Sequence, residues 1–129
     1  MGLKQFGFSK LEKLTSKKDI EELFKKGSSF YLNEFQVRYL NSSSAPHHKL
    51  LISVPKRNFK RAVDRNLLKR RIREAYRLNK HLIENVNDQS SLSIAFIYLS
   101  KQVLTFDNIQ AQLIQCLERL GTINVEENE

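Results

Sequence analysis

Cysteine, glycine and long apolar runs are scarce in this chain of 129 residues. The single cysteine, Cys116, excludes a disulfide within the chain and fits a reducing compartment. The four glycines form no glycine-rich phosphate-binding loop. No apolar run approaches the roughly 20 residues that a membrane-spanning helix needs, and the N-terminal residues lack the apolar core of an export signal. We therefore expect a cytoplasmic protein.

No catalytic or metal-binding constellation can be recognised in the sequence. His47 and His48 are adjacent in a Ser/Pro-rich loop, but no Cys, Asp or Glu stands at metal-ligand spacing, so we expect both to be solvent-exposed. Cys116 falls in an amphipathic helical pattern, which favours a structural thiol over a nucleophile. The residues alone indicate a binding module with no catalytic residue and no metal site of its own.

The hydrophobic content, 40%, and several strongly patterned segments predict a folded domain and not a disordered basic tail. The length fits a single domain over residues 1–129 with one modest core. We expect residues 1–15 to form a loose basic arm and residues 122–129 to form a frayed acidic tail.

Positive charge is concentrated in one stretch, residues 56–80, with the sequence KRNFKRAVDRNLLKRRIREAYRLNK. This stretch holds eleven Lys or Arg residues and two acids, a net charge of +9, against +8 for the whole chain. The rest of the protein is therefore nearly neutral. Charge that is localised in this way indicates a polyanionic partner.

From about Ala62 the basic stretch lacks glycine and proline and is rich in helix-forming residues. A helical period places polar, mostly cationic side chains on one face: Asn66, Lys69, Arg70, Arg73 and Arg77. It places apolar side chains on another face, which we expect to join the core: Leu68, Ile72, Ala75 and Tyr76. The two acids are expected to form ion pairs within the stretch, for instance Glu74 with Arg70 or Arg71, and Asp64 with Lys60 or Arg61.

The cationic helix is less well suited to three further roles. A solvated surface helix normally mixes charge signs, because like charges four residues apart repel. A membrane-surface helix needs more Trp, Phe and Leu on its apolar face. DNA base readout needs mixed donors and acceptors, whereas this face is almost uniformly cationic. RNA is therefore the favoured partner, and we expect neither DNA nor membrane binding.

The rest of the chain alternates between helical and strand-like patterns. Ser16 with Asp19 is a weak capping box that begins a short helix, and Gly27 ends it. The predicted helices and strands cover residues 17–26, 30–40, 49–54, 62–85, 92–99 and 107–120, the last helix ending at Gly121. We expect the first two strands to form an antiparallel hairpin. The apolar strand 92–99 is expected inside the sheet, parallel to the strand 49–54.

The stretch A-V-D-R-N-L-L-K-R-R-I-R-E-A-Y-R resembles the signature of the bacterial ribonuclease P protein family, R-N-x-x-K-R-x-x-R-E followed by an aromatic residue and often Arg. The matching positions are Arg65, Asn66, Lys69, Arg70, Arg73, Glu74, Tyr76 and Arg77. The preceding S-V-P-K-R-N-F-K-R-A-V and the N-terminal L-x-x-x-x-D-I-x-x-L-F-K-K-G pattern also resemble the family. One departure is Leu67, where the family usually has Arg.

The resemblance implies an α+β fold, a small two-layer α/β sandwich of order αβββαβα with a left-handed βαβ crossover, similar to a ribosomal-protein domain. It implies a protein subunit of a ribonucleoprotein endoribonuclease. In that enzyme the RNA subunit, with bound Mg²⁺, removes the 5′ leader of precursor tRNA. A ribosomal or ribosome-assembly protein is the alternative, and it predicts rRNA binding without a nuclease role.

The resemblance also implies two binding surfaces. The residues expected to grip the RNA subunit are Lys56, Arg57, Arg61, Arg65, Asn66, Lys69, Arg70, Arg73 and Arg77. The residues expected to line a cleft for the single-stranded leader are Ile20, Phe24, Phe35, Gln36, Arg38 and Ser53. Phe24 and Phe35 could equally be ordinary core residues. The family often has aromatic residues where this chain has Ile20 and Arg38, so weaker stacking and more charge pairing are expected here.

Overall fold

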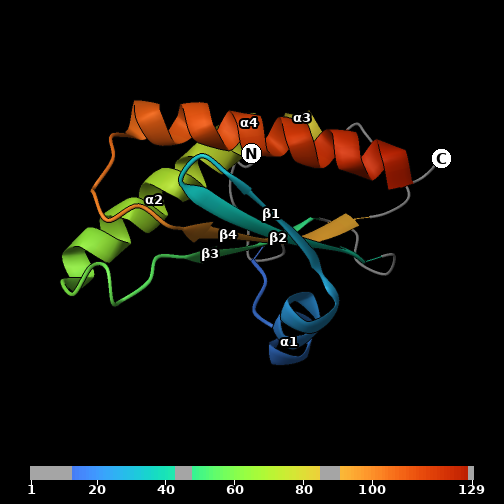
Figure 1. The fold of residues 1–129 in the computed structure, drawn as a ribbon, viewed down its shortest axis with the longest axis horizontal. Coiled ribbons are helices and arrows are strands. Elements are labelled where there is room, and N and C mark those ends of the chain that lie inside the picture. Colours follow the sequence, from blue (N-terminus) through green and yellow to red (C-terminus); the bar gives the residue numbers. More distant parts are fainter. Residues whose placement is uncertain (1–12, 43–47, 85–90, 128–129) are drawn as a thin grey trace, which may run out of the picture.

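The computed structural model describes residues 13–42, 48–84 and 91–127 (Figure 1). In chain order the elements are α1 (Lys17–Lys26), β1 (Ser28–Leu32), β2 (Phe35–Ser42), β3 (Lys49–Ser53), α2 (Ala62–Asn79), α3 (His81–Glu84), β4 (Ser91–Tyr98) and α4 (Phe106–Glu127). The strands form one sheet; α2 and α4 lie on one side of it and α1 on the other (Figure 1). The predicted α+β class is confirmed.

The sheet is mixed, with strand order β1-β2-β4-β3. β1 pairs antiparallel with β2, β2 pairs antiparallel with β4, and β3 pairs parallel with β4. β4 therefore has a partner on both edges, and all but one of its residues are buried. This explains its almost continuous apolar sequence, and it confirms both the predicted interior position and the parallel pairing with β3.

The predicted hairpin between residues 30–40 and 49–54 is wrong, because β4 lies between β2 and β3. The hairpin is instead β1–β2, which divides the long predicted strand at a tight turn. Asn33 takes φ 56° there, a left-handed conformation that Asn tolerates better than most residues. The turn is held against α4, since Asn33 Nδ2 donates to Gln115 Oε1 (2.9 Å) and the Glu34 N–H donates to Gln112 Oε1 (3.1 Å).

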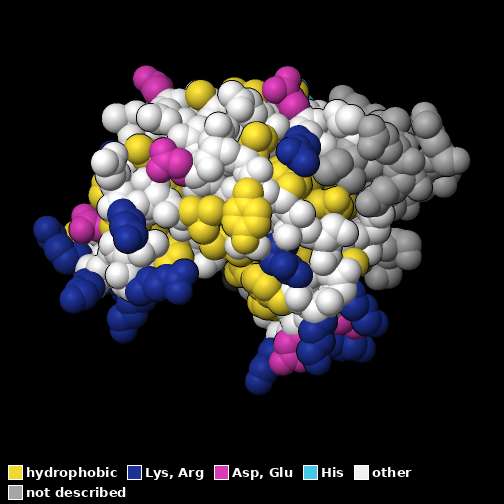
Figure 2. Space-filling view, viewed as in Figure 1, with side chains coloured by type: hydrophobic (Ala, Val, Ile, Leu, Met, Phe, Trp, Pro, Cys, Tyr) yellow, Lys and Arg dark blue, Asp and Glu magenta, His cyan; other side chains and the backbone are white. Residues whose placement is uncertain are grey.

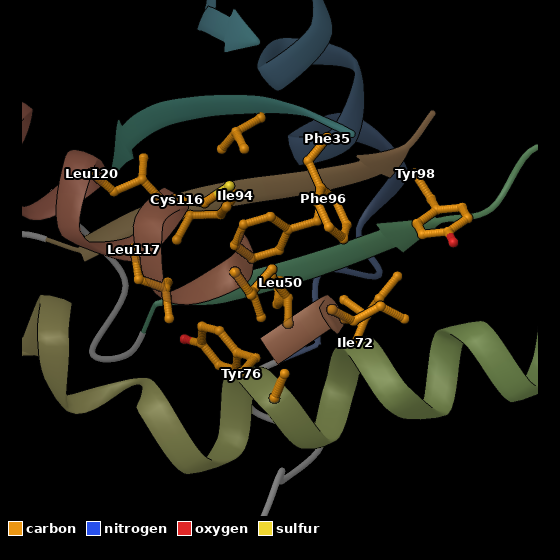
Figure 3. Packing of buried hydrophobic residues seen from close by; sticks show 14 of the residues in the cluster. Phe35, Leu50, Ile72, Tyr76, Ile94, Phe96, Tyr98, Cys116, Leu117 and Leu120 are labelled. Atoms are coloured by element: carbon orange, nitrogen blue, oxygen red, sulfur yellow. The ribbon is translucent and has the colours of Figure 1, made fainter. Parts of the chain in front are cut away.

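The larger core lies between the sheet and the pair α2 and α4 (Figure 3). It includes the four residues predicted to form the apolar face of the basic helix: Leu68, Ile72, Ala75 and Tyr76. Phe35 packs edge-on against Tyr98, with ring centroids 5.6 Å apart. The Tyr98 hydroxyl donates to Gln102 O (2.5 Å) and accepts from the Leu104 N–H (3.2 Å), so the loop after β4 is fastened to the core.

Cys116 lies in the same core and is fully buried. Burial raises the pKa of its thiol to about 12, because a thiolate would lose its hydration there. The thiol is therefore protonated at neutral pH, and the prediction of a structural cysteine is confirmed.

Two helix boundaries differ from the prediction. The basic helix ends at Asn79, and α3 follows as a separate turn, where one helix to residue 85 was predicted. The Asn79 amide donates to Ala75 O (2.8 Å) and to Gln110 Oε1 (3.1 Å), which fixes this end to α4. α4 continues through Gly121 to Glu127, so the predicted end of the last helix at Gly121 is wrong. Gly121 is buried and does not adopt the left-handed conformation with positive φ that is common for a glycine at a helix end.

The short helix α1 has the predicted ends. The Ser16 hydroxyl accepts from the Asp19 N–H (3.4 Å), and the Gly27 N–H donates to Leu23 O (3.0 Å). A Cβ at Gly27 would lie 2.3 Å from Leu23 O and 2.9 Å from Tyr39 O, so only glycine permits this close approach of α1 to β2.

A smaller core of Leu14, Leu23 and Ala95 joins α1 and the preceding segment to the sheet. The Leu14 N–H donates to Leu50 O (2.9 Å) on β3. The predicted loose arm over residues 1–15 is therefore wrong for Lys13 and Leu14, and residues 1–12 lie outside the described ranges.

Candidate nucleic-acid interface

Lysine and arginine side chains gather in two places on the face shown in Figure 2. One group lies over the beginning of α2 and the turn that precedes it, and the other lies over α1; a hollow beneath the sheet separates them (Figures 1 and 2). These two basic regions are carried by the elements on which the two binding surfaces were predicted.

The residues predicted to bind an RNA subunit lie on α2 and in the turn of residues 55–61. Five are exposed: Lys56, Arg57, Arg61, Asn66 and Arg70. The other four are half-buried: Arg65, Lys69, Arg73 and Arg77. We call these nine residues the α2 surface. Because all of them lie within 22 consecutive positions, one helix and one turn are enough to bring them together.

Arg65 has a structural task within the α2 surface. Its Nη1 donates to Phe59 O (2.7 Å) and Lys60 O (3.0 Å), which fixes the turn before the helix. Phe59 is itself buried and packs against Tyr98, with ring centroids 5.9 Å apart. The exposed cations of the turn, such as Arg57, are therefore presented from a fixed backbone.

The ion pairs differ in part from the prediction. Arg61 Nε lies 4.0 Å from Asp64 Oδ2, so the predicted pairing of Asp64 is confirmed. The predicted pairing of Glu74 within the helix is confirmed, but its partner is Arg77 and not Arg70 or Arg71: Arg77 Nε donates to Glu74 Oε1 (2.7 Å), and Arg71 Nη1 donates to Leu104 O (2.5 Å). Arg77 therefore shares its charge with an acid, and Arg71 is bound to the loop between β4 and α4.

A groove of about 220 Å³ adjoins the α2 surface where the N-terminal segment, β3 and α2 meet. Its lining residues are Lys13, Leu14, Thr15, Leu50, Leu51, Ile52, Lys69 and Arg73. Two cations of the predicted stripe thus face a concave site beside a third, Lys13. Clustered cations of this kind attract phosphate groups and displace counterions.

The second predicted surface lies between α1 and the sheet. Side chains alternate along a strand, so Phe35 and Val37 of β2 enter the larger core, whereas Gln36 and Arg38 point to the α1 side. Ser53 of β3 lies on the α1 side by the same alternation, since its neighbour Ile52 packs against the larger core. We call Ile20, Phe24, Gln36, Arg38 and Ser53 the α1–sheet surface.

Phe35 does not belong to the α1–sheet surface, and its predicted place in the cleft is wrong. Its side chain is fully buried on the opposite face, against Phe96 and Tyr98. Phe24, in contrast, is 41% exposed and is not a core residue. Ile20 is half-buried and packs against the smaller core.

Arg38 joins the two elements of this surface. Its Nη2 donates to Phe24 O (2.8 Å) and Gly27 O (3.4 Å) at the end of α1, and its Cζ lies 5.2 Å from the centre of the Phe24 ring. A family resemblance could not reveal this role, because the family often has an aromatic residue at this position.

The described part of the chain holds no group of three or more His, Cys, Asp or Glu side chains that could bind a metal ion. The predicted exposure of His48 is wrong, because this half-buried side chain accepts from the Leu92 N–H at Nδ1 (2.8 Å). His47 lies outside the described ranges. No helix within those ranges is long and apolar enough to cross a membrane.

A basic helix on a small α+β domain, with a hollow between two cationic regions, defines a candidate nucleic-acid-binding protein. The family model described as Ribonuclease P matches residues 8–121 of the chain. The chain belongs to the ribonuclease P protein family, which confirms the resemblance of its basic helix to the family signature.

Relatives and solved structures agree with the family assignment. The chain is 37% identical over 120 residues to a ribonuclease P protein component of Porphyromonas gingivalis, covering 90% of this chain and 88% of the relative. A ribonuclease P protein component of Nitrosococcus oceani is 32% identical over 117 residues, covering 91% and 90%. The RNase P protein from Thermotoga maritima superposes with a TM-score of 0.69 at 27% identity, covering 84% of this chain and 96% of that one.

A Staphylococcus aureus RNase P protein mutant with defective mRNA degradation activity superposes with a TM-score of 0.73 at 29% identity, covering 86% of this chain and 89% of that one. The fold of this chain is therefore that of bacterial RNase P proteins.

Proposed function

We propose that this chain is the protein subunit of ribonuclease P and assists the removal of the 5′ leader from precursor tRNA. The observation that carries this proposal is the basic helix α2, which bears the family motif and exposes its cations beside a fixed turn. Phosphodiester hydrolysis would be supplied by the RNA subunit with its Mg²⁺, as the resemblance to the family implies.

The α2 surface would bind the RNA subunit. Arg and Lys side chains replace the counterions of an RNA backbone, so two RNAs can approach each other closely. Arg70 is exposed on the outer side of α2, while Lys69 and Arg73 line the groove beside β3. Arginine forks match the geometry of phosphate oxygens better than lysine does.

The α1–sheet surface would bind the leader. Single-stranded RNA is bound without strict sequence preference when bases stack on aromatic rings and cations follow the backbone. Phe24 offers an exposed ring, and Gln36 and Ser53 offer polar groups on the sheet. The basic side chains around α1 and α2 flank the hollow between them (Figure 2).

Reconstitution tests the proposal. The purified protein is mixed with a bacterial ribonuclease P RNA and a 5′-labelled precursor tRNA at a Mg²⁺ concentration at which the RNA alone cleaves poorly. We expect mature 5′ ends only when the protein is present. If cleavage is unchanged and the protein binds this RNA no better than bulk rRNA, the proposal fails and a ribosomal role is favoured.

A further inference from the structure

Arg38 extends from the middle of β2 to the last turn of α1. Its Nη2 lies within hydrogen-bonding distance of three backbone oxygens there, those of Phe24 (2.8 Å), Gly27 (3.4 Å) and Leu23 (3.5 Å). The last carbonyls of a helix lack partners within the helix and carry partial negative charge, so a cation stabilises them. Arg38 therefore fastens the carboxyl end of α1 to the sheet.

The guanidinium of Arg38 has little capacity left for a ligand. Nη2 is engaged by the α1 carbonyls, and Nε is buried without a hydrogen-bond partner among the described residues. The group also lies over the Phe24 ring, at 5.2 Å from its centre. Two of its three nitrogens are thus withdrawn from solution, and a direct fork on an RNA phosphate would require the contacts with α1 to break.

We propose that Arg38 is a positioning residue for the leader, acting through α1 rather than by contact with RNA. It fixes the distance between the exposed Phe24 ring and the polar residues of the sheet, Gln36 and Ser53. A single-stranded RNA segment then meets a preformed surface and does not have to order α1. This inference rests on the proposed function.

Gly27, whose carbonyl Arg38 contacts, confines the positioning role of Arg38 to the end of α1. Gly27 brings the helix so close to β2 that a Cβ would lie 2.9 Å from Tyr39 O. Arg38 bonds to the carbonyl of this same glycine. The helix end is therefore held by close backbone contact and by a cation, in addition to the smaller core, and loss of the cation removes the polar part of this attachment.

The test compares Arg38→Met with a matched control, Arg119→Met. Arg119 also lies over an aromatic ring, at 4.6 Å from the centre of Phe30, but it belongs to α4 and to neither binding surface. Each reconstituted complex is titrated with two precursor tRNAs, one with a long leader and one with a single leader nucleotide. The salt dependence of binding and the hydrogen exchange of the α1 amides are measured in parallel.

For Arg38→Met we expect affinity for the long-leader precursor to fall about tenfold and α1 amides to exchange about tenfold faster. Affinity for the short-leader precursor and the salt slope should stay at the wild-type values. Arg119→Met should change none of these four quantities.

Three results would overturn the inference. A salt slope reduced by about 0.7, with unchanged α1 exchange, would show a direct phosphate contact. An equal loss for both precursors, in a variant that still folds, would show that Arg38 does not act on the leader. Unchanged leader affinity would show that Arg38 has no role in binding. If Arg38→Met does not fold, Arg38→Lys replaces it, and leader affinity must then change in proportion to α1 exchange.

Failure of the proposed function gives a different result from failure of the positioning role. If the wild-type complex binds both precursors equally well, leader binding itself is absent. If the wild type discriminates between them and the Arg38 variants discriminate equally well, only the positioning role is lost.

Discussion

The α2 surface and the α1–sheet surface are built in opposite ways. The α2 surface comes from one continuous stretch, and many of its cations, such as Lys56 and Arg70, point into solvent. The α1–sheet surface combines Phe24, Gln36 and Ser53 from three separate elements. Its central cation, Arg38, is bound to the protein's own backbone. The first surface therefore depends on charge and the second on geometry, so different substitutions should affect them.

The largest expected effect is on the α2 surface. Arg70→Ala combined with Arg73→Ala should weaken RNA-subunit binding by roughly 100-fold and lower the salt slope by about two phosphate contacts' worth. Binding titrations over a range of salt concentrations measure both quantities. An unchanged salt slope would remove this face of α2 from the interface.

The matched control for that pair is Lys101→Ala combined with Arg119→Ala. Both residues are exposed and lie outside the two surfaces, and the net charge changes by the same amount. Their loss should leave the salt slope at the wild-type value. An equal reduction would mean that net charge, and not the α2 surface, determines RNA binding.

A smaller effect is expected from the amino end of α1. Ser16→Ala removes the capping acceptor of the Asp19 N–H and should destabilise α1 by about 1 kcal/mol. Because the α1–sheet surface depends on geometry, long-leader affinity should fall a few-fold while RNA-subunit affinity is unchanged. Titration of the reconstituted complex with the long-leader and the short-leader precursor tRNA measures the change in leader affinity.

Thr105→Ala is the matched control, because the Thr105 hydroxyl accepts from the Asn108 N–H (3.2 Å) at the start of α4. It should lower the stability of the protein without changing leader discrimination. Equal effects of the two substitutions would contradict the geometric dependence of the α1–sheet surface.

The smallest effect is a change in the free energy of unfolding that arises in the core supporting α2, and this change is absent at neutral pH. Burial raises the pKa of Cys116 from 9.0 to about 12. Above pH 9 the unfolded chain therefore releases this proton while the folded protein retains it, so the free energy of unfolding decreases as pH rises towards 12. Denaturant titrations from pH 7 to 10 should show this decrease for the wild type. The decrease should be smaller for Cys116→Ala, and an identical pH dependence would contradict it.

The α2 surface was largely predictable because its information is local. A helical period separates Leu68, Ile72, Ala75 and Tyr76 from the cations, and these four residues do enter the core. Ion pairing was less predictable, since Glu74 has cations on both sides and Arg71 is bound instead to Leu104 O in the loop before α4, whereas Arg77 pairs with Glu74.

The α1–sheet surface was less predictable because it depends on long-range pairing. The turn at Asn33 contains no glycine, and nothing near residues 30–54 indicates that β4 separates β2 from β3. Phe24 and Phe35 are the same type of residue, yet Phe35 is buried in the core and Phe24 is 41% exposed. Only the side of the sheet that each occupies distinguishes them.

The central position of β4 also has a consequence for the order in which the strands can pair during synthesis. β2 and β3 both precede β4 in the chain, yet each pairs with β4 and not with the other. While the ribosome has not yet released residues 91–98, a growing chain can form the β1–β2 hairpin and α2, but β3 has no neighbour in the sheet. Such distant pairings are formed late and slowly. The sheet beneath the α1–sheet surface is therefore complete only after residues 91–98 have left the ribosome, because β4 is the neighbour of both β2 and β3.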